Sequence, residues 1–420
     1  MGDVAVTTTE RDALPANDVD LEHHGAAFRD DNRNVVARLH GSGCPIGHSD
    51  HYGGFWAIYG YQAVYDATHD SELFSSRHAP PEIDKGVPSS GTPLALLPID
   101  FDGPIVQEQR RIVLSYFSPG TAAREEPRLR EIAHELVDEF IERGHCDLTQ
   151  ELLTPLPARW ILEALGWDTT DWRGWIELLH TLVHDRAEQP EKAQAAVEEL
   201  ARRVMTEVAT RRASGDLGDD LTGAILRGTP GGEPLPEHQV IGYLVNLLLG
   251  GMDTTAGLTG NVVEELDRDH ELRQRLIDDR SLLPVATEEF LRHDSPAFGL
   301  YRTVMRDEVF HGQQLHAGDR AVILFPAAGF DPAAYEHPDE IRLDRTGSRH
   351  LSFGVGPHRC LGSHHARVMF RVMIDEVLTR LPDFEISGPV VRYQDAGDVW
   401  AIRHLPVTFT PGPRLLDAQR

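Results

Sequence analysis

The chain has 420 residues, with 40 basic and 67 acidic side chains and a formal net charge of −27. A surface this acidic repels nucleic acid and anionic lipid, so we expect neither nucleic acid nor a membrane as a partner. Residues 1–25 have no basic start and no apolar run, so we expect no signal peptide or anchor and a cytoplasmic protein. Cys44, Cys146 and Cys360 show no CxxC spacing, which argues against a disulfide framework or a structural zinc cluster.

Helical periodicity dominates the chain, which predicts a mainly α fold with small β-sheets. Helices are predicted over residues 105–118, 126–143, 150–166, 190–212, 237–268, 271–279, 283–293 and 360–381. Strands are predicted over residues 55–59, 300–304, 321–324 and 406–410, which are too few and too scattered for an alternating βαβ pattern. The length allows two domains, but we find no internal repeat and no linker that would divide the chain.

Residues 77–100 are rich in Pro, Gly and Ser and form the longest predicted loop. A loop of this length inside a compact domain is more often functional than idle, which makes it a candidate lid or pocket wall.

The predicted helix over residues 237–268 contains Gly250 and Gly251, followed by Asp253 and Thr254. Two glycines cost a helix about 1.5 to 2 kcal/mol relative to alanine, so some gain must offset them. Two interpretations remain open. The missing side chains let a flat ligand approach the backbone beside an acid and a hydroxyl, or they allow a close helix crossing in which threonines bond back to carbonyls.

Glu289 and Arg292 lie three residues apart on a short, apolar predicted helix. Side chains at this spacing share a helix face and can form an ion pair. The apolar surroundings favour an interior pair held by further hydrogen bonds, and Arg345 is the candidate third member.

Cys360 is preceded by a glycine-rich loop and followed by a predicted helix. Loop amides and a helix N-terminus favour a thiolate, which can act as a nucleophile or as a metal ligand. A zinc site would need more cysteines, and a nucleophile would need a histidine base whose position the sequence does not give. The remaining alternative is an axial ligand of haem iron. His180 and His184 lie four apart, but no third ligand is in view, so we expect no metal site there.

The ordered stretch "FGVGPHRCLG" over residues 353–362 resembles the haem-binding signature of the cytochrome P-450 family. Glu289 and Arg292 resemble the structural Glu-x-x-Arg pair of that family, and "GGMDTT" over residues 250–255 resembles its oxygen-activation motif. The resemblance extends from about Cys44 to about Pro411. It implies the P-450 fold, with haem between the long central helix and the cysteine loop. It also implies a flexible tail over residues 1–30 and a single haem-thiolate domain over residues 31–420.

The resemblance also implies roles for individual residues. Cys360 would be the proximal ligand of the iron in haem b, with Phe353 packed near the haem and sulfur. Asp253 and Thr254 would be the acid and alcohol of proton delivery. The other expected haem contacts are Arg110, Arg302 and His358 at the propionates and Gly250, Gly251 and Gly354 along the ring.

Two positions depart from the pattern of the family. Val106 stands where many bacterial relatives have a histidine that contacts a propionate. Gly329 and Phe330 stand where relatives commonly have Asn-Arg, which puts any polar network there in doubt.

The implied reaction is monooxygenation of an apolar small molecule with O2, by hydroxylation or epoxidation. Electrons would come from a separate ferredoxin and ferredoxin reductase, steered by a basic face containing Arg111, Arg359 and Arg367. Substrate walls are expected from residues 77–100, 295–300 and 398–403, including Phe298, Leu300 and Trp400. The alternatives are oxidative coupling, desaturation, peroxide-driven oxidation, or a haem-thiolate sensor that does not turn over oxygen.

Overall fold

A computed structural model describes residues 17–77, 82, 94–186, 189–345, 349–395 and 397–415. Most of the predicted lid over residues 77–100 therefore lies outside the described residues. The helices are α1 Ala26–Leu39, α2 Tyr61–His69, α3 Pro104–Val113, α4 Pro119–Asp138, α5 Pro155–Leu165, α6 Trp172–His184, α7 Pro190–Ser214, α8 Leu221–Arg227, α9 Glu237–Met252, α10 Thr254–Arg268, α11 His270–Asp278, α12 Leu283–His293, α13 Phe325–Ala328 and α14 Ser363–Arg380.

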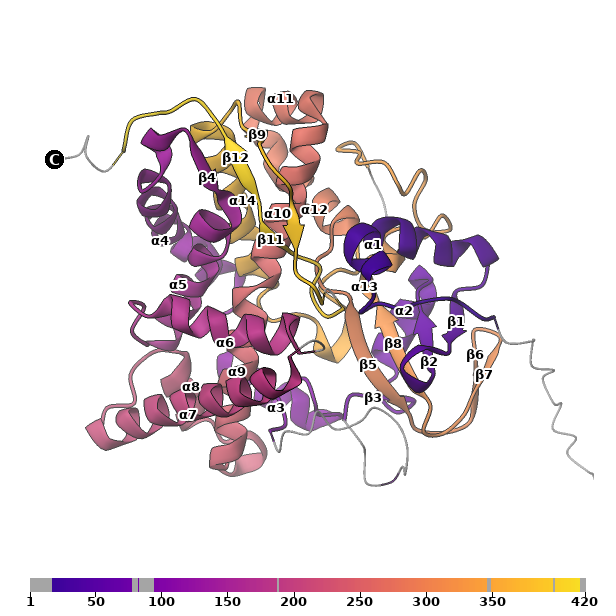
Figure 1. Cartoon of the computed structure of the whole chain (residues 1–420). Coiled ribbons are helices and arrows are strands. Elements are labelled where there is room, and N and C mark those ends of the chain that lie inside the picture. The colour runs from indigo at the N-terminus through magenta and orange to yellow at the C-terminus, as the bar shows by residue number, and fades with distance from the viewer. Residues whose placement is uncertain are drawn as a thin grey trace, which may run out of the picture.

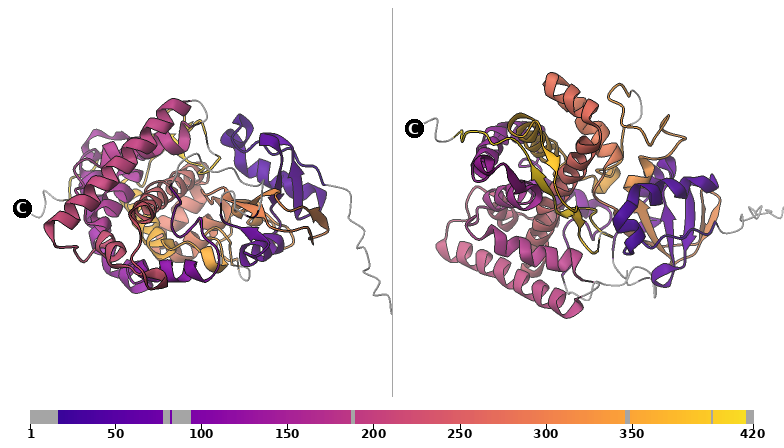
Figure 2. Two further views of the ribbon diagram at one scale, coloured as in Figure 1. Left: turned by 90° about the horizontal axis from the view of Figure 1, so that it is seen from below. Right: turned by 45° about the horizontal axis from the view of Figure 1, so that its top comes forward.

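The helices form a large body on one side of the molecule, and the strand-rich part lies on the other (Figure 1). Both views of Figure 2 keep this division. Within the helical body α14 packs against α4 and α10, α5 against α9, and α6 against α7. One large apolar cluster fills this body and includes buried side chains from α4, α5, α9, α10 and α14.

The main sheet has the strand order β1-β2-β8-β5-β3, with β2 and β8 parallel and the other neighbours antiparallel. Its strands are β1 Ile46–Ser49, β2 Phe55–Ile58, β3 Phe74–Ser75, β5 Gly299–Val304 and β8 Arg320–Leu324. The smaller sheets join β4 His145–Asp147, β12 Pro406–Thr408 and β9 Glu385–Ile386, then β10 Val391–Arg392 with β11 Ile402–His404, and β6 Glu308–Phe310 with β7 Gln313–Leu315. The expected class, mainly α with small sheets, is confirmed.

Helix termini follow local chemistry in several places. Pro119 begins α4, where the side chain of Ser118 accepts a hydrogen bond from the Thr121 amide. Pro104 begins α3 after Gly103, whose φ of 73° suits glycine. The predicted helix over residues 105–118 therefore begins close to its expected position but ends earlier, at Val113.

Residues 17–30 pack against the rest of the molecule, so the predicted flexible tail over residues 1–30 is wrong for this part. Leu21 and Phe28 are buried in a cluster with strands β2 and β8. Val19 also donates a backbone hydrogen bond to His48 at 2.8 Å. The sequence shows little apolar periodicity here because the segment contributes single anchors rather than a continuous stripe. Residues 1–16 lie outside the described residues.

The predicted helix over residues 237–268 is divided at Asp253, which ends α9 and precedes α10. Asp253 departs slightly from helical geometry, with φ of −111° and ψ of −36°. The break follows the two glycines, which weaken the helix, and it directs the Asp253 side chain away from the helix axis toward α6.

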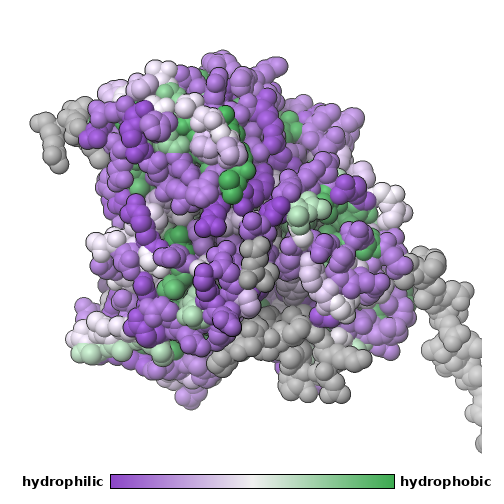
Figure 3. All heavy atoms as spheres, in the orientation of Figure 1, coloured by the Kyte–Doolittle hydropathy of each residue, from purple (hydrophilic) through white to green (hydrophobic). Residues whose placement is uncertain are grey.

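The face of the molecule in Figure 3 is predominantly hydrophilic, as the high content of charged side chains requires. Among the described residues, no helix combines the length and the apolar character needed to cross a membrane.

Candidate functional site

A cavity of about 270 Å³ lies between the α9–α10 break and the loop that contains Cys360. The segment from Pro296 to Arg302 forms another wall, while α3 contributes Arg110 and α5 contributes Trp160 and Ile161. Much of the lining is apolar: Pro98, Ile99, Phe117, Ile161, Leu247, Leu258, Ala297 and Leu300. The cavity therefore brings together segments that are far apart in the sequence. Its apolar lining suits an apolar ligand.

Cys360 lines this cavity, between the turn Gly356–His358 and the start of α14. Its amide donates to the Phe353 carbonyl at 2.8 Å, which closes the loop around the sulfur. Burial raises the pKa of the Cys360 thiol, although the Gly362 amide and nearby arginines oppose the rise. In the protein alone, burial therefore outweighs the loop amide, which acts in the direction that the sequence indicated.

Three groups that can carry positive charge line the same cavity as Cys360. Arg110 lies on α3, Arg302 on β5, and His358 two residues before the cysteine. Burial lowers the pKa of Arg302 to about 10 and that of His358 to about 4. Among the described residues, no carboxylate forms an ion pair with Arg110 or Arg302.

The cation set fits a flat macrocycle that carries two carboxylates. His358 uses Nε2 with the Ser76 hydroxyl at 3.0 Å, whereas its buried Nδ1 has no partner. Buried charges and orphaned ring nitrogens are costly unless a bound group satisfies them. The residues present therefore fit haem b, with Cys360 available to the iron and the cations available to the propionates.

The two glycines of α9 have different surroundings. A Cβ on Gly250 would meet no atom within 4 Å, because this side of the helix opens into the cavity. A Cβ on Gly251 would lie 3.0 Å from the Ile161 side chain on α5. Both interpretations of the sequence therefore hold, one for each glycine: Gly250 leaves space and Gly251 permits a close helix crossing. Gly354 has a φ of 62°, which suits glycine, and a Cβ at this position would lie 3.4 Å from the Phe325 ring.

Asp253 and Thr254 are separated in space although they are adjacent in the chain. Thr254 lines the cavity, and its hydroxyl donates to the Gly250 carbonyl at 3.2 Å. Asp253 is buried behind the cavity wall, with its Oδ2 2.6 Å from Nε2 of His184. Burial alone would raise the pKa of Asp253, but the two histidines of α6 outweigh it and hold that pKa well below its usual range.

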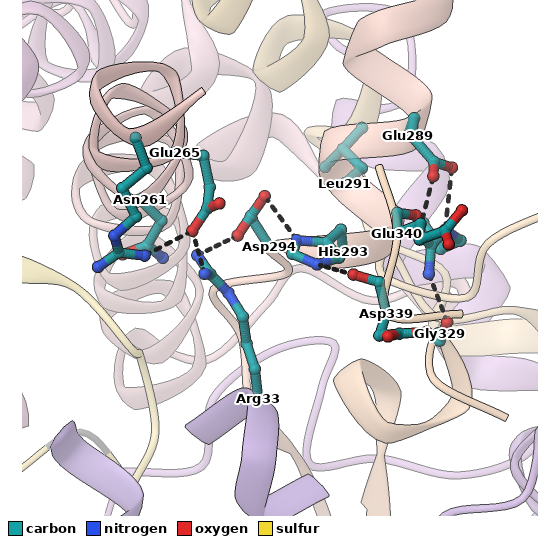
Figure 4. A network of polar contacts seen from close by, with 12 residues as sticks. Arg33, Asn261, Glu265, Glu289, Leu291, His293, Asp294, Gly329, Asp339 and Glu340 are labelled. Carbon is teal, nitrogen blue, oxygen red and sulfur yellow. Dashed lines mark hydrogen bonds and ion pairs between the residues drawn. The ribbon is translucent and has the colours of Figure 1, made fainter. Parts of the chain in front are cut away.

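Glu289 and Arg292 form the interior pair that the sequence predicted. Arg292 donates from Nε and Nη2 to Glu289 at 2.9 and 2.7 Å, and from its remaining hydrogens to the carbonyls of Gly329, Pro338 and Glu340. Figure 4 shows Glu289 beside Glu340 and Gly329 in this network. Arg345 completes the network by donating to Glu289 at 3.1 Å. Burial opposes ionisation of Glu289, but its hydrogen bonds outweigh burial and lower its pKa.

Only some of the residues expected to form the substrate wall line the cavity. Leu300 lines the cavity, as do Pro98 and Ile99 from the end of the predicted lid. Phe298 instead stacks on His23 at 4.6 Å between ring centroids, and Trp400 packs under Arg392 at 4.0 Å. Neither residue lines the cavity, because both side chains help to fasten the N-terminal segment or the C-terminal strands to the core.

The three arginines expected on the electron-donor face differ in their availability. Arg111 and Arg359 are exposed, and among the described residues neither forms an ion pair. Arg367 is bound by Glu288 through two hydrogen bonds of 2.6 and 2.7 Å and lies over the Phe353 ring. The unpaired charge of this face is therefore concentrated on Arg111 and Arg359.

The two departures noted in the sequence have structural counterparts. Val106 is buried and does not line the cavity, so it cannot replace a histidine there. Gly329 presents its carbonyl to Arg292, and a Cβ at this position would lie 2.4 Å from the Arg292 carbonyl oxygen. Position 329 therefore requires glycine, because its backbone lies too close to the Arg292 carbonyl for a side chain.

Comparison with known proteins identifies the family. The family model described as cytochrome P450 matches residues 257–387. Steroid C26-monooxygenase of Mycolicibacterium smegmatis is 32% identical over 365 residues, covering 85% of this chain and 88% of that protein. The chain belongs to the cytochrome P450 family.

Solved structures extend the likeness over the whole P450 fold. A mutant of P450 EryK in complex with erythromycin B superposes with a TM-score of 0.82 at 26% identity, over 92% of this chain and 98% of that one. CYP109E1 from Bacillus megaterium in complex with testosterone gives the same TM-score and identity, over 91% and 99%. This P450 is accordingly a monooxygenase that uses haem b, O2 and electrons from redox partners.

Two groups of histidines beside the P450 site have partners that the sequence did not reveal. His365 on α14 is almost fully buried, lines the cavity and lies between the rings of Trp160 and Phe117. His180 and His184 contact Asp253 rather than a metal. Their i, i+4 spacing was visible in the sequence, but their carboxylate partner lies 69 residues from His184 along the chain.

Proposed function

We propose that this P450 inserts oxygen into a small to medium-sized, largely apolar molecule of terpenoid or steroid kind, by hydroxylation or epoxidation. The observation that carries the proposal is the single cavity in which Cys360, three cationic groups and an apolar wall meet. The similarity to a steroid C26-monooxygenase and to a testosterone complex supports this class of substrate. Residues 31–420 would act as one catalytic domain, against which residues 17–30 pack.

In this proposal Cys360 would hold the haem iron through its thiolate. Arg110, Arg302 and His358 would neutralise the propionates, since each lines the cavity without a carboxylate partner among the described residues, Arg302 buried and the other two half-buried. Haem b supplies the activation of O2 when it is bound. Phe353 and Gly354 hold the cysteine loop close to the ring, and Gly250 leaves room for the ring on the opposite side.

The chain's own contribution to the chemistry is proton delivery and exclusion of water. Thr254 presents its hydroxyl to the cavity, and Asp253 supplies the adjoining acid. The apolar wall around Leu247 and Leu300 holds a C–H bond in a place that bulk water does not fill.

Electrons would come from a ferredoxin and its reductase in the cytoplasm. An acidic ferredoxin is attracted to the exposed Arg111 and Arg359 although the rest of the protein repels it. Docking there brings the donor to the side of the molecule on which the Cys360 loop lies.

The decisive experiment compares the wild type with Cys360→Ser in the reduced, carbon monoxide-bound form. The wild type should show the red-shifted Soret band of a thiolate-ligated haem, and the variant should lose it. The same band in the variant would assign the ligand to another residue. Substrate class is then tested by titrating linalool, testosterone and a polar sugar alcohol. Soret shifts with the first two and none with the third support an apolar substrate, and the reverse pattern would contradict it.

A further inference from the structure

A polar cluster lies behind the cavity wall, on the side of Asp253 that faces away from Cys360. It consists of His180 and His184 on α6, Asp253 at the α9–α10 break, and Tyr393 just after β10. The ring of Tyr393 stacks on that of His184 with 3.8 Å between centroids. The cluster therefore joins α6, the helix break and the C-terminal strands at one carboxylate.

The hydrogen bonds of His184 define its protonation. Nδ1 lies 2.9 Å from the backbone carbonyl of Asp395, which can only accept, so Nδ1 carries a hydrogen. Nε2 lies 2.6 Å from Oδ2 of Asp253. A hydrogen bond at this position requires one proton between nitrogen and oxygen, either as imidazolium with carboxylate or as neutral imidazole with carboxylic acid. His184 and Asp253 thus share one transferable proton in a site that is largely buried.

His180 connects the second oxygen of this carboxylate to the outside. Its Nε2 lies 3.5 Å from Oδ1 of Asp253 and 3.2 Å from the Tyr393 hydroxyl, and its Nδ1 lies 3.0 Å from the same hydroxyl. The His180 side chain is 17% exposed, whereas that of His184 is completely buried. A proton can therefore enter from solvent at His180 and reach Asp253 without passing through the cavity.

The charges around the cluster favour the protonated state. Asp395 contributes its carbonyl to His184 and its carboxylate to His24 at 2.6 Å. The remaining charged neighbours of the cluster are Asp185, Arg186, Asp147 and Arg403. Burial lowers the pKa of His184, but Asp253 and Asp395 outweigh burial and raise that pKa above its usual value.

We propose that His184 and His180 are positioning residues for proton delivery, in which His184 stores the proton that Asp253 passes toward Thr254 and His180 reloads the pair from solvent. The proposal rests on the proposed function, since it assigns a proton source to the Asp253 and Thr254 relay. A cationic lysine or arginine would also hold Asp253 in place, but its high pKa would make it a poor donor.

The proton balance of the step is simple. The proton on Nε2 of His184 moves to Oδ2 of Asp253, which leaves His184 neutral with its Nδ1 hydrogen still on the Asp395 carbonyl. Asp253 then gives up this proton, and one from solvent replaces it through His180. Insertion of one oxygen atom with release of the other as water consumes two protons and two electrons, and the redox partner supplies the electrons.

The pair of His184 and Asp253 holds its proton at low pH and loses it as pH rises. Since the pKa of His184 is raised, the imidazolium persists above the ordinary histidine value of about 6.5 and is lost at higher pH. Product formed per electron should therefore decline on the alkaline side in the wild type.

The test uses haem-loaded protein with redox partners and substrate, over a range of pH in H2O and in D2O. His180→Gln and His184→Gln retain hydrogen-bonding groups but cannot store a proton. Both should lower product per electron roughly tenfold, which is less than the roughly 10²-fold loss expected for a group that transfers the proton directly, and should abolish the alkaline decline. His134→Gln is the matched control, because His134 also pairs with a carboxylate, Glu376 at 2.9 Å, but contacts no part of this cluster.

A second readout does not depend on turnover. Ring nitrogen NMR of the diamagnetic carbon monoxide form should show His184 protonated on both nitrogens above about pH 6.5, and Asp253→Asn should remove this behaviour. Normal haem content shows that each variant is folded, and if His184→Gln fails to incorporate haem, the more exposed His180→Gln decides the question.

The outcomes separate the two proposals. If both histidine variants keep the wild-type pH profile and isotope effect while Asp253→Asn alters them, the histidines are structural and the inference is wrong. If Asp253→Asn also leaves them unchanged, the proposed relay itself is wrong.

Discussion

Asp253 and Thr254 are adjacent in the chain, but their side chains lie in different surroundings. The Thr254 hydroxyl faces the cavity, while the Asp253 carboxylate is turned toward α6 and its histidines. In the proposed relay, a proton would pass from the polar cluster around Asp253 to the apolar cavity at this point in the chain.

Thr254→Ala and Asp253→Asn test this division. Both variants should retain haem and bind substrate, because neither side chain belongs to the cation set that fits the propionates. Thr254→Ala should divert electrons to peroxide, and Asp253→Asn should slow turnover by roughly 10²-fold, since it removes the acid. The measurements are NADH consumed, peroxide formed and product formed. Wild-type ratios and rates in both variants would exclude the relay.

Prediction from sequence was strongest for residues whose role is set by local order. Cys360 and Glu289 could be found because their partners lie within a short motif or on one helix turn. Phe298 and Trp400 were expected to line the cavity but pack elsewhere. The sequence alone does not reveal whether an aromatic side chain lines a cavity or packs in the core. The histidines of α6 were seen but not interpreted, because their carboxylate comes from a distant helix.

At the scale of elements, the break between α9 and α10 separates two packing demands. On one side Gly250 opens to the cavity, and on the other Gly251 meets α5. The sequence predicted one continuous helix, because apolar periodicity continues through the break and a departure of one residue leaves that period unchanged.

A pair of matched substitutions distinguishes these demands. Gly250→Ala should raise the free energy of unfolding of the haem-free protein by up to about 1 kcal/mol through helix propensity, and should lower haem content because its methyl group enters the space left for the ring. Gly251→Ala should lower the free energy of unfolding by about 1 kcal/mol or more, because the new methyl group would lie 3.0 Å from the Ile161 side chain. Urea denaturation of both variants is the measurement. Equal effects in the two would show that the α5 contact yields without cost.

Helix α1 is fastened to the body by Arg33, which binds Glu265 of α10 and Asp294 after α12 (Figure 4). Burial opposes ionisation of Asp294, but Arg33 and His293 outweigh it and lower its pKa to about 2. The packing of residues 17–30 was missed from the sequence because such single, long-range anchors leave no periodic pattern.

This ion pair predicts a pH effect on stability. A carboxyl group with a lowered pKa stabilises the fold above its ordinary pKa, and this contribution fades as pH falls toward the lowered value. Asp294→Asn should cost about 2 kcal/mol near pH 6, and this difference should roughly halve near pH 3. Urea titrations of the wild type and the variant at both pH values check it. A constant difference would mean that Asp294 titrates normally.

At the scale of the whole molecule, a net charge of −27 contrasts with the exposed arginines near the cysteine loop. Overall repulsion and local attraction together orient an acidic donor before contact, which increases the fraction of productive encounters.

Reduction by ferredoxin should therefore slow as salt rises and the Debye length falls from about 10 Å to about 3 Å. Arg111→Glu or Arg359→Glu should slow reduction several-fold at low salt and leave the substrate-induced Soret shift unchanged. Arg202→Glu on α7, also an exposed arginine, serves as the control. Stopped-flow reduction kinetics provide the measurement. Salt-independent rates that also resist both reversals would place the donor elsewhere.

Arg292 has a consequence for the range of sequences that this fold tolerates. All five guanidinium hydrogens have acceptors, two on Glu289 and three on backbone carbonyls. Lysine has three donors without a planar fork, so even this swap of one cation for another leaves buried acceptors empty. In a library randomised at position 292 and selected for bound haem, arginine alone should survive. Position 292 should therefore remain arginine in every variant that keeps this fold, even when the residues that line the cavity change to accept another substrate.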